Sequence, residues 1–230
     1  MRVVAVMLAC VAGSLIGTFQ SAALAAGEHA GWGGESCITA DARNANWAAR
    51  DMHGQTLEYT DLRGADLQNI NLRDARLKCV DLRNTDLRGA DLRGADLLGV
   101  RLTGAKLEGA RFDGVHALGI SMEDATLRQL PDDQVHAIMN DCTGCDFESA
   151  DLRGRNLASV HLVGVNMNGA DLTNADLRGA RLVGANFSNA RLAGAKLAGA
   201  TLTGCNFRNV DLSQVDLSNV QMTGVNFSNR

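Results

Sequence analysis

The feature that most constrains this chain is a large apolar residue that returns at every fifth position over most of its length. Between residues 61 and 112 the returning residues are Leu62, Leu67, Leu72, Leu77, Leu82, Leu87, Leu92, Leu97, Leu102, Leu107 and Phe112. A small or β-branched residue precedes nearly every one of them by two places. A period of five matches neither the 3.6-residue turn of a helix nor the two-residue alternation of a strand. The sequence therefore predicts an array of short repeats.

The composition agrees with a chain built from short strands and tight corners. The chain has 4% aromatic residues, 25 glycines and one proline in 230 residues, which is unusual for a globular domain. Proline lacks the N–H that a strand ladder needs, so a chain made of strands should avoid it. Glycine and asparagine, which often follow the leucine by two places, suit corners with a positive φ.

The repeats resemble those of the pentapeptide-repeat family, whose consensus is A-(D/N)-L-x-x. The matching segments include ADLQN at Ala65, ADLRG at Ala90 and Ala175, and ADLTN at Ala170. The resemblance implies an all-β fold, a right-handed four-sided parallel β-helix in which one pentapeptide forms each side and twenty residues form each coil. Counting the repeats then predicts about nine coils, interrupted by one short helical or loop insertion.

The charged residues support coils of twenty residues independently of the resemblance. At the exposed position before the leucine, many residues twenty places apart carry opposite charges: Asp81 and Arg101, Asp86 and Lys106, Asp91 and Arg111, Asp171 and Arg191, Asp176 and Lys196. Opposite charges on neighbouring strands are favourable, so these pairs indicate the register. Asp61 beside Asp81 is an exception to this rule.

The pattern divides the chain into five segments. Residues 1–25 contain Arg2, an apolar stretch and an A-x-A site, which together predict a cleavable signal peptide. A retained membrane anchor is the alternative for this segment. We expect an irregular lead-in at 26–39, a first repeat block at 40–130, a helical or loop insertion at 131–144, and a second repeat block at 145–230. Residues 40–56 are either a degenerate first coil or a capping helix, and we favour the coil.

A signal peptide predicts a periplasmic or secreted protein with no stable membrane span after cleavage. Loss of Arg2 with the signal leaves 21 basic and 26 acidic residues, a formal charge of −5. Because nucleic-acid binding requires a basic face, we expect no nucleic-acid partner.

The motif Cys142-x-x-Cys145 lies at the end of the expected insertion. Outside the cytoplasm such a pair favours a structural disulfide. A metal site or a redox centre are the alternatives, although only His136 lies close in sequence to complete a zinc site, which needs four ligands. We expect no cofactor and no metal.

Twenty-residue coils also predict an internal core ladder, with an asparagine stack beside it. The ladder would consist of Phe147, Met167, Phe187, Phe207 and Phe227.

One outward face of the second block forms a flat, weakly charged strip. We select it as a candidate interaction surface, with an ordinary solvated face as the alternative: His161, Val163, Arg181, Val183 and Thr203. The sequence ends in repeat phase at residues 227–230, and an exposed coil end invites pairing with another chain. This predicts a homodimer through the C-terminal coil.

No phosphate-binding loop, HExxH or GxSxG motif is present, so we expect no enzymatic activity. The sequence favours an exported rigid solenoid that serves as a protein-interaction or structural module with an unknown protein partner. Two alternatives remain. The first is a DNA-mimicking, gyrase-binding protein of the quinolone-resistance type, which the family resemblance implies. The second is a redox or metal protein that uses Cys142 and Cys145.

Overall fold

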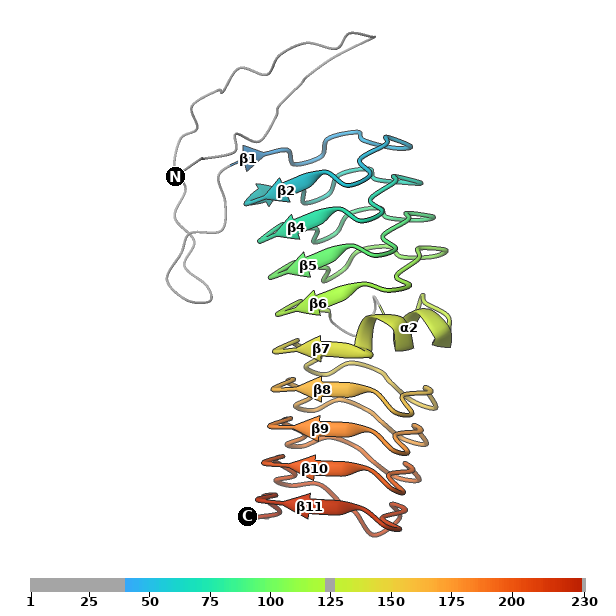
Figure 1. Ribbon diagram of the computed structural model, residues 1–230, viewed down its shortest axis with the longest axis vertical. Helices are drawn as coiled ribbons and strands as arrows, with labels where there is room; N and C mark the ends of the chain where they lie inside the picture. Colours follow the sequence, from blue (N-terminus) through green and yellow to red (C-terminus); the bar gives the residue numbers. More distant parts are fainter. Residues whose placement is uncertain (1–39, 123–126, 229–230) are drawn as a thin grey trace, which may run out of the picture.

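The structure is a computed structural model that describes residues 40–122 and 127–228. The predicted signal peptide and the lead-in at 26–39 lie outside the described residues. The described chain winds into a rod of stacked coils with one helix on its side (Figure 1). The elements are β1 (Ala40–Asp41), β2 (Thr56–Glu58), β3 (Thr60–Asp61), β4 (Arg76–Lys78), β5 (Asp96–Leu98), β6 (His116–Leu118), α2 (Asp132–Met139), β7 (Asp141–Thr143), β8 (His161–Val163), β9 (Arg181–Val183), β10 (Thr201–Thr203) and β11 (Gln221–Thr223).

One side of the rod is a parallel sheet of nine strands in the order β11-β10-β9-β8-β7-β6-β5-β4-β2. Each strand pairs with the strand of the next coil, as Leu162 does with Leu182. The other sides are held by single bridges between residues twenty apart, such as Asp81 with Arg101 and Asp86 with Lys106. The predicted parallel β-solenoid of about nine coils and its twenty-residue register are both confirmed. The exception is also present, because Asp61 bridges to Asp81.

The residues at every fifth position form one continuous core. Between residues 57 and 207 the leucines and phenylalanines at these positions are 0–4% exposed. Each coil turns sharply after them, and many of the corner residues have a positive φ. Gly94 (φ +68°) illustrates the constraint, since a Cβ there would lie 2.2 Å from Asp74 Oδ1. No single coil could bury its leucines alone, so the stack is stabilised by contacts between neighbouring coils.

Residues 40–56 form a degenerate coil and not a capping helix. β1 pairs with β3, and Asn46 and Asp51 bridge to the next coil. Trp47 is partly buried against the first leucines of the core.

The predicted insertion contains a helix, but its C-terminal boundary at residue 144 is wrong. Pro131 precedes α2, and Asp132 and Asp133 occupy the first turn. The sheet resumes at β7, so Cys142 belongs to a strand and the insertion ends at Asn140. Leu118 pairs with Thr143, which is 25 residues away where other coils have 20. The insertion therefore adds five residues, and the five-residue phase is unchanged beyond it.

Side-chain amides replace backbone hydrogen-bond acceptors where the insertion interrupts the coil. In a regular coil, the Leu87 N–H donates to Lys106 O of the next coil at 2.8 Å. At the insertion, the Leu107 N–H donates to Gln129 Oε1 (2.8 Å) and the Phe112 N–H donates to Gln134 Oε1 (2.6 Å). These contacts keep buried N–H groups paired, as protein interiors require.

Side chains of the coil that follows the insertion also hydrogen-bond to its backbone, here as donors to carbonyl groups. The Arg155 guanidinium donates to Leu130 O (3.0 Å) and Leu127 O (3.2 Å), and it also pairs with Asp132 at 2.5 Å. His136 Nε2 lies 3.0 Å from Ala158 O. The insertion is thus attached to the coils before and after it, which keeps the two repeat blocks in one stack.

We expect Gln134→Ala to lower the free energy of unfolding by about 1–3 kcal/mol, because it leaves the buried Phe112 N–H without an acceptor. Chemical denaturation measures the effect. Gln214→Ala, at an exposed position, is the control and should change stability by less than about 0.5 kcal/mol. Equal stabilities for the two variants would contradict the assigned role of Gln134.

Candidate interaction face

The outward surface of the nine-stranded sheet, which we call the long face, presents two parallel rows of side chains. Within each three-residue strand the middle residue points inward, as the exposed–buried–exposed pattern of β5, β6, β8 and β9 shows. The third residues of β5 to β10 form the apolar row, which consists of Leu98, Leu118, Thr143, Val163, Val183 and Thr203. Four of its members are exposed aliphatic side chains: Leu98 (38%), Leu118 (46%), Val163 (42%) and Val183 (37%).

The structure places the five residues of the predicted strip on three adjacent strands, β8, β9 and β10, with their side chains on the long face. Three of the strip's residues, Val163, Val183 and Thr203, make up half of the apolar row. Leu98 and Leu118 continue it across the insertion, because β6 pairs with β7 and β7 with β8. The prediction missed them because the five extra residues hide the pairing of Leu118 with Thr143. The available signal was an apolar residue directly after the inward one, in DLLG and HALG.

The first residues of the strands form the second row, which we call the charged row. Its members are Thr56, Arg76, Asp96, His116, Asp141, His161, Arg181, Thr201 and Gln221. Arg76 Nε lies 3.6 Å from Asp96 Oδ2, in the register that the sequence predicted. The row carries acidic residues on β5 and β7 and basic residues on β4 and β9, with a histidine on each of β6 and β8.

Two hollows follow the apolar row. The larger measures about 570 Å³ and is lined by residues of β4 to β7 and the corners that follow them, including Leu98, Gly99, Leu118 and Gly119. The smaller measures about 240 Å³ and is lined by Thr143, His161, Val163, Arg181 and Val183. The corners after β5, β6 and β7 are glycines, whereas the corner after β4 is Cys79, and all four corners line the larger hollow.

Many carboxylates of the other sides are neutralised by an arginine of their own repeat. In the tripeptide Asp81-Leu82-Arg83, Asp81 Oδ1 accepts the Arg83 N–H (3.2 Å) and Nε–H (2.9 Å), and Oδ2 accepts Nη2–H at 2.6 Å. The predicted partner from the next coil is more distant: Lys106 Nζ lies 3.6 Å from Asp86 Oδ2, whereas Arg88 Nη2 lies at 2.6 Å. The same arrangement recurs at Asp151 and Asp176. These pairs leave little uncompensated negative charge on the first block.

These pairs predict that the protein loses stability in acid. The hydrogen bond from Arg43 lowers the pKa of Asp41 to about 2, and that from Arg88 lowers the pKa of Asp86. A carboxylate whose pKa is lower in the folded state stabilises the fold above its unfolded pKa of about 3.9, and this contribution is lost as the pH falls through the folded value. We therefore expect the melting temperature to fall between about pH 4 and pH 2. Asp86→Asn should reduce the fall, and a melting temperature that stays constant down to pH 2 would contradict the assignment.

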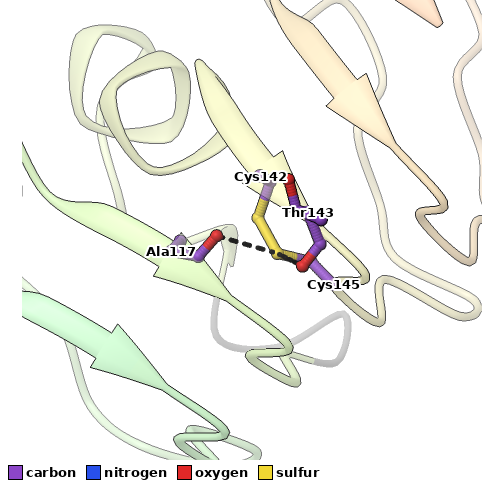
Figure 2. Close-up of a disulfide and its surroundings, with 4 residues drawn as sticks. All are labelled: Ala117, Cys142, Thr143 and Cys145. Atoms are coloured by element: carbon purple, nitrogen blue, oxygen red, sulfur yellow. Dashed lines mark hydrogen bonds between the residues drawn. A yellow bond between two sulfur atoms is a disulfide. The ribbon is translucent and has the colours of Figure 1, made fainter. Parts of the chain in front are cut away.

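The sulfurs of Cys142 and Cys145 lie 1.99 Å apart, at bonding distance (Figure 2). Cys142 is the middle residue of β7 and points into the core, and Cys145 follows the next corner. Both are buried, at 0% and 1% exposure, and Cys145 Sγ lies 3.9 Å from Ala117 O of the preceding coil. Reactive cysteines occupy partly exposed sites, and this pair does not. Among the described residues no group of three or more His, Cys, Asp or Glu side chains is arranged to hold a metal ion.

The structure brings the residues of the predicted ladder into one column. Phe147, Met167, Phe187 and Phe207 are 0–2% exposed, and the rings of Phe187 and Phe207 stack at 4.9 Å. Phe227 stacks on Phe207 at 5.8 Å but is 42% exposed, so it is not internal as predicted. No described coil covers it. The asparagine stack lies alongside, where Asn186 Nδ2 donates to Asn166 Oδ1 at 3.2 Å.

The coil that contains β11 exposes Met222 (40%) as well as Phe227. The homodimer through this coil stays a prediction. Among the described residues, no helix is both long and apolar enough to span a membrane.

The model of the pentapeptide-repeat family matches this chain in eight copies, over residues 37–74, 56–94, 75–114, 141–179, 156–189 and 190–229. These matches span more than half of the sequence, and the chain therefore belongs to the pentapeptide-repeat family. No curated protein matches it.

Solved structures of other pentapeptide-repeat proteins are similar to this one. A trypsin-treated form of QnrB1, a plasmid-mediated fluoroquinolone resistance protein, is 21% identical with a TM-score of 0.45, over 79% of this chain and 81% of that one. HetL from the cyanobacterium Nostoc sp. strain PCC 7120, involved in heterocyst differentiation regulation, is 26% identical with a TM-score of 0.33, over 81% and 84%. Rfr23 from the cyanobacterium Cyanothece 51142 is 22% identical with a TM-score of 0.25, over 62% and 91%.

Proposed function

We propose that this pentapeptide-repeat protein is an exported, non-enzymatic, rigid interaction module whose contact surface is the long face. The observation that carries the proposal is the apolar row, which runs from Leu98 to Thr203 without a charged side chain. Contiguous exposed apolar surface marks sites of interaction with other macromolecules. Glu58 and Lys78 show that the repeat accepts a charged residue in the third position of a strand. An ordinary solvated face could carry such residues on every strand, so their absence from β5 to β10 favours a contact surface.

The sheet also holds this surface rigid before any partner arrives. The strands beneath Leu118, Val163 and Val183 are each paired with a neighbouring strand on both sides. Such side chains lose little conformational freedom on binding, and a preorganised surface binds with a smaller entropic cost. A rigid surface of this kind suits a structural or interaction module, a role that needs no catalytic group.

Two further features support export. Residues 1–25 have the composition of a signal peptide, and a disulfide between Cys142 and Cys145 would persist in an oxidising compartment. Cell fractionation and determination of the mature N-terminus test this part of the proposal. A cytoplasmic, uncleaved protein would favour the gyrase-binding alternative, which the internally neutralised Asp–Arg pairs do not support.

The buried position of Cys142 and Cys145 supports a structural bond and not a redox centre. We expect the intact mass of the purified protein to show one disulfide between them, with both sulfurs protected from alkylation under native conditions without reductant. A pair of free thiols that reacts rapidly in the folded protein would overturn this assignment.

The test of the long face compares two variants in a capture experiment from periplasmic extract. Val163→Asp combined with Val183→Asp places charge in the apolar row, and Ala193→Asp places charge on an exposed residue of another side. The proposal expects the wild type and the Ala193→Asp control to retain the same proteins. The double variant should lose them. If the double variant captures the same proteins as the wild type, the proposal is overturned.

A further inference from the structure

We propose that the long face binds a second copy of this chain, packed face to face with the two rods antiparallel. The proposed twofold axis runs along β7, the middle strand of the nine-stranded sheet. This inference rests on the function proposed for the long face and names its partner.

The geometry of the sheet determines which strands meet. Rotation by a half turn about β7 reverses the order of the strands and preserves the position of each residue within its strand. β6 of one copy then faces β8 of the other, β5 faces β9, and β4 faces β10. First-position residues face first-position residues, and third-position residues face third-position residues.

On either side of the axis this arrangement pairs opposite charges, whereas Asp141 on β7 lies at the axis, opposite its own counterpart. Asp96, on β5, faces Arg181 on β9 of the second copy, and the symmetry forms this pair twice. Both side chains are exposed in the single chain, and the intramolecular neighbour of Asp96 is Arg76 at 3.6 Å. Asp96 would therefore lie between two arginines, and complementary charges of this kind fix the register of an interface.

The apolar row is complementary in the same register. Leu98 faces Val183, and Leu118 faces Val163, so each exposed aliphatic side chain meets another. Burial of such pairs removes apolar surface from water at both ends of the contact. His116 faces His161, and neutral imidazoles contribute one donor and one acceptor each.

The other symmetric arrangement of the two faces fails on chemistry. A twofold axis along the rod would bring each strand opposite itself and reverse the positions within it. Asp96 would then face Leu98, and Arg181 would face Val183. Asp96 and Arg181 would then lose the opposite charge that each faces in the first arrangement, which is unfavourable.

The size of the face predicts a weak association. Nine strands at ~4.8 Å spacing give a length of ~38 Å, and three-residue strands are ~10 Å wide, so each copy buries several hundred Å². Specific interfaces of this size lie at the low, transient end of the known range. The dimer should therefore form only at high protein concentration.

Analytical ultracentrifugation of the full-length mature protein over a wide concentration range tests the proposal. We expect reversible dimerisation that Asp96→Arg or Arg181→Asp weakens at least about tenfold, because each variant creates two like-charge pairs. The double variant, Asp96→Arg with Arg181→Asp, should restore association to within about threefold of wild type. Arg191→Asp is the matched control, since Arg191 also pairs with a neighbouring coil (Asp171, 3.7 Å) but lies on another side of the rod.

A cross-linking experiment tests the register directly. Leu98 and Val183 lie four strand spacings apart in one chain, ~19 Å, which is too far for an intramolecular disulfide. Oxidation of the Leu98→Cys, Val183→Cys double variant should therefore give a covalent dimer. The Leu98→Cys, Thr223→Cys pair should give far less, because these two third-position residues of β5 and β11 do not face each other across the two copies.

The outcomes separate this inference from the proposed function. A monomer at all concentrations, or a dimer that Phe227→Asp abolishes and Asp96→Arg leaves intact, overturns the inference. The proposed function still stands in either case if the long-face variants lose other proteins in the capture experiment. If neither a second copy nor another protein depends on the long face, both proposals fail.

Discussion

Leu92→Asp should unfold several coils of the solenoid and lower the free energy of unfolding by more than about 4 kcal/mol. Leu92 is 0% exposed, in the interior of the first repeat block. A carboxylate in this column would have no cation or donor within the apolar interior, and an unpaired buried charge is among the most destabilising changes known. Because each coil is stabilised by its neighbours, the damage should spread to the coils on either side.

Leu98→Asp is the matched control for this prediction. It also replaces a leucine by aspartate, on the next side of the same coil. Leu98, however, points outward from β5 and is 38% exposed. We expect the control to keep the far-ultraviolet circular dichroism spectrum and the denaturation midpoint of the wild type, within about 0.5 kcal/mol. Equal behaviour of the two variants would show that the five-residue period does not separate inside from outside.

Phe187→Ala should cost about 3–5 kcal/mol in the free energy of unfolding, the usual cost of removing a phenylalanine from a core. Phe187 is 1% exposed and its ring stacks on that of Phe207 at 4.9 Å. Removing the ring leaves a cavity between stacked coils whose backbones are fixed by ladder hydrogen bonds, so the neighbours have little freedom to close it.

Phe227→Ala removes the same ring from the same column, where it is 42% exposed. We expect the cost of this variant to be less than half that of Phe187→Ala, because water already contacts the ring. Guanidinium denaturation of both variants measures the difference. Equal costs would mean either that Phe227 is covered in solution or that Phe187 is not in the core.

The register of the solenoid could be predicted from the sequence because the repeat is a property of side-chain chemistry. An inward leucine every five residues sets the sides of the coil, and pairs such as Asp86 and Lys106 identify coils of twenty residues. The same periodicity correctly favoured a degenerate coil at 40–56, where Trp47 replaces a leucine. Resemblance to a known family gave the same answer.

The details of the insertion could not be predicted in this way, because they depend on contacts between side chains and backbone. Nothing in the order of residues shows that the side-chain oxygens of Gln129 and Gln134 replace the backbone carbonyl acceptors of a regular coil. The strand β7 was assigned to the insertion because Asp141-Cys142-Thr143 lacks the repeat consensus. That error also concealed half of the apolar row, since Leu118 joins Thr143 only through the longer coil.

Exposure at the end of the stack was missed for a related reason. The period places Phe227 in the ladder as securely as Phe207, but burial depends on a further coil that covers it. A repeat pattern predicts which residues point inward, and it does not predict where the covering ends. The sequence predicts charge pairs between coils, but in the structure the pair within one repeat is tighter: Arg83 lies 2.6 Å from Asp81, and Arg101 of the next coil lies 3.8 Å from it.

A crystal structure of the protein would show whether the side chains at every fifth position share one interior. We expect parallel strands with Leu162 opposite Leu182 and Leu182 opposite Leu202, and with these leucines facing the axis of the rod. Electron density that places the leucines on the faces of a helical bundle, or in contact with solvent, would contradict it.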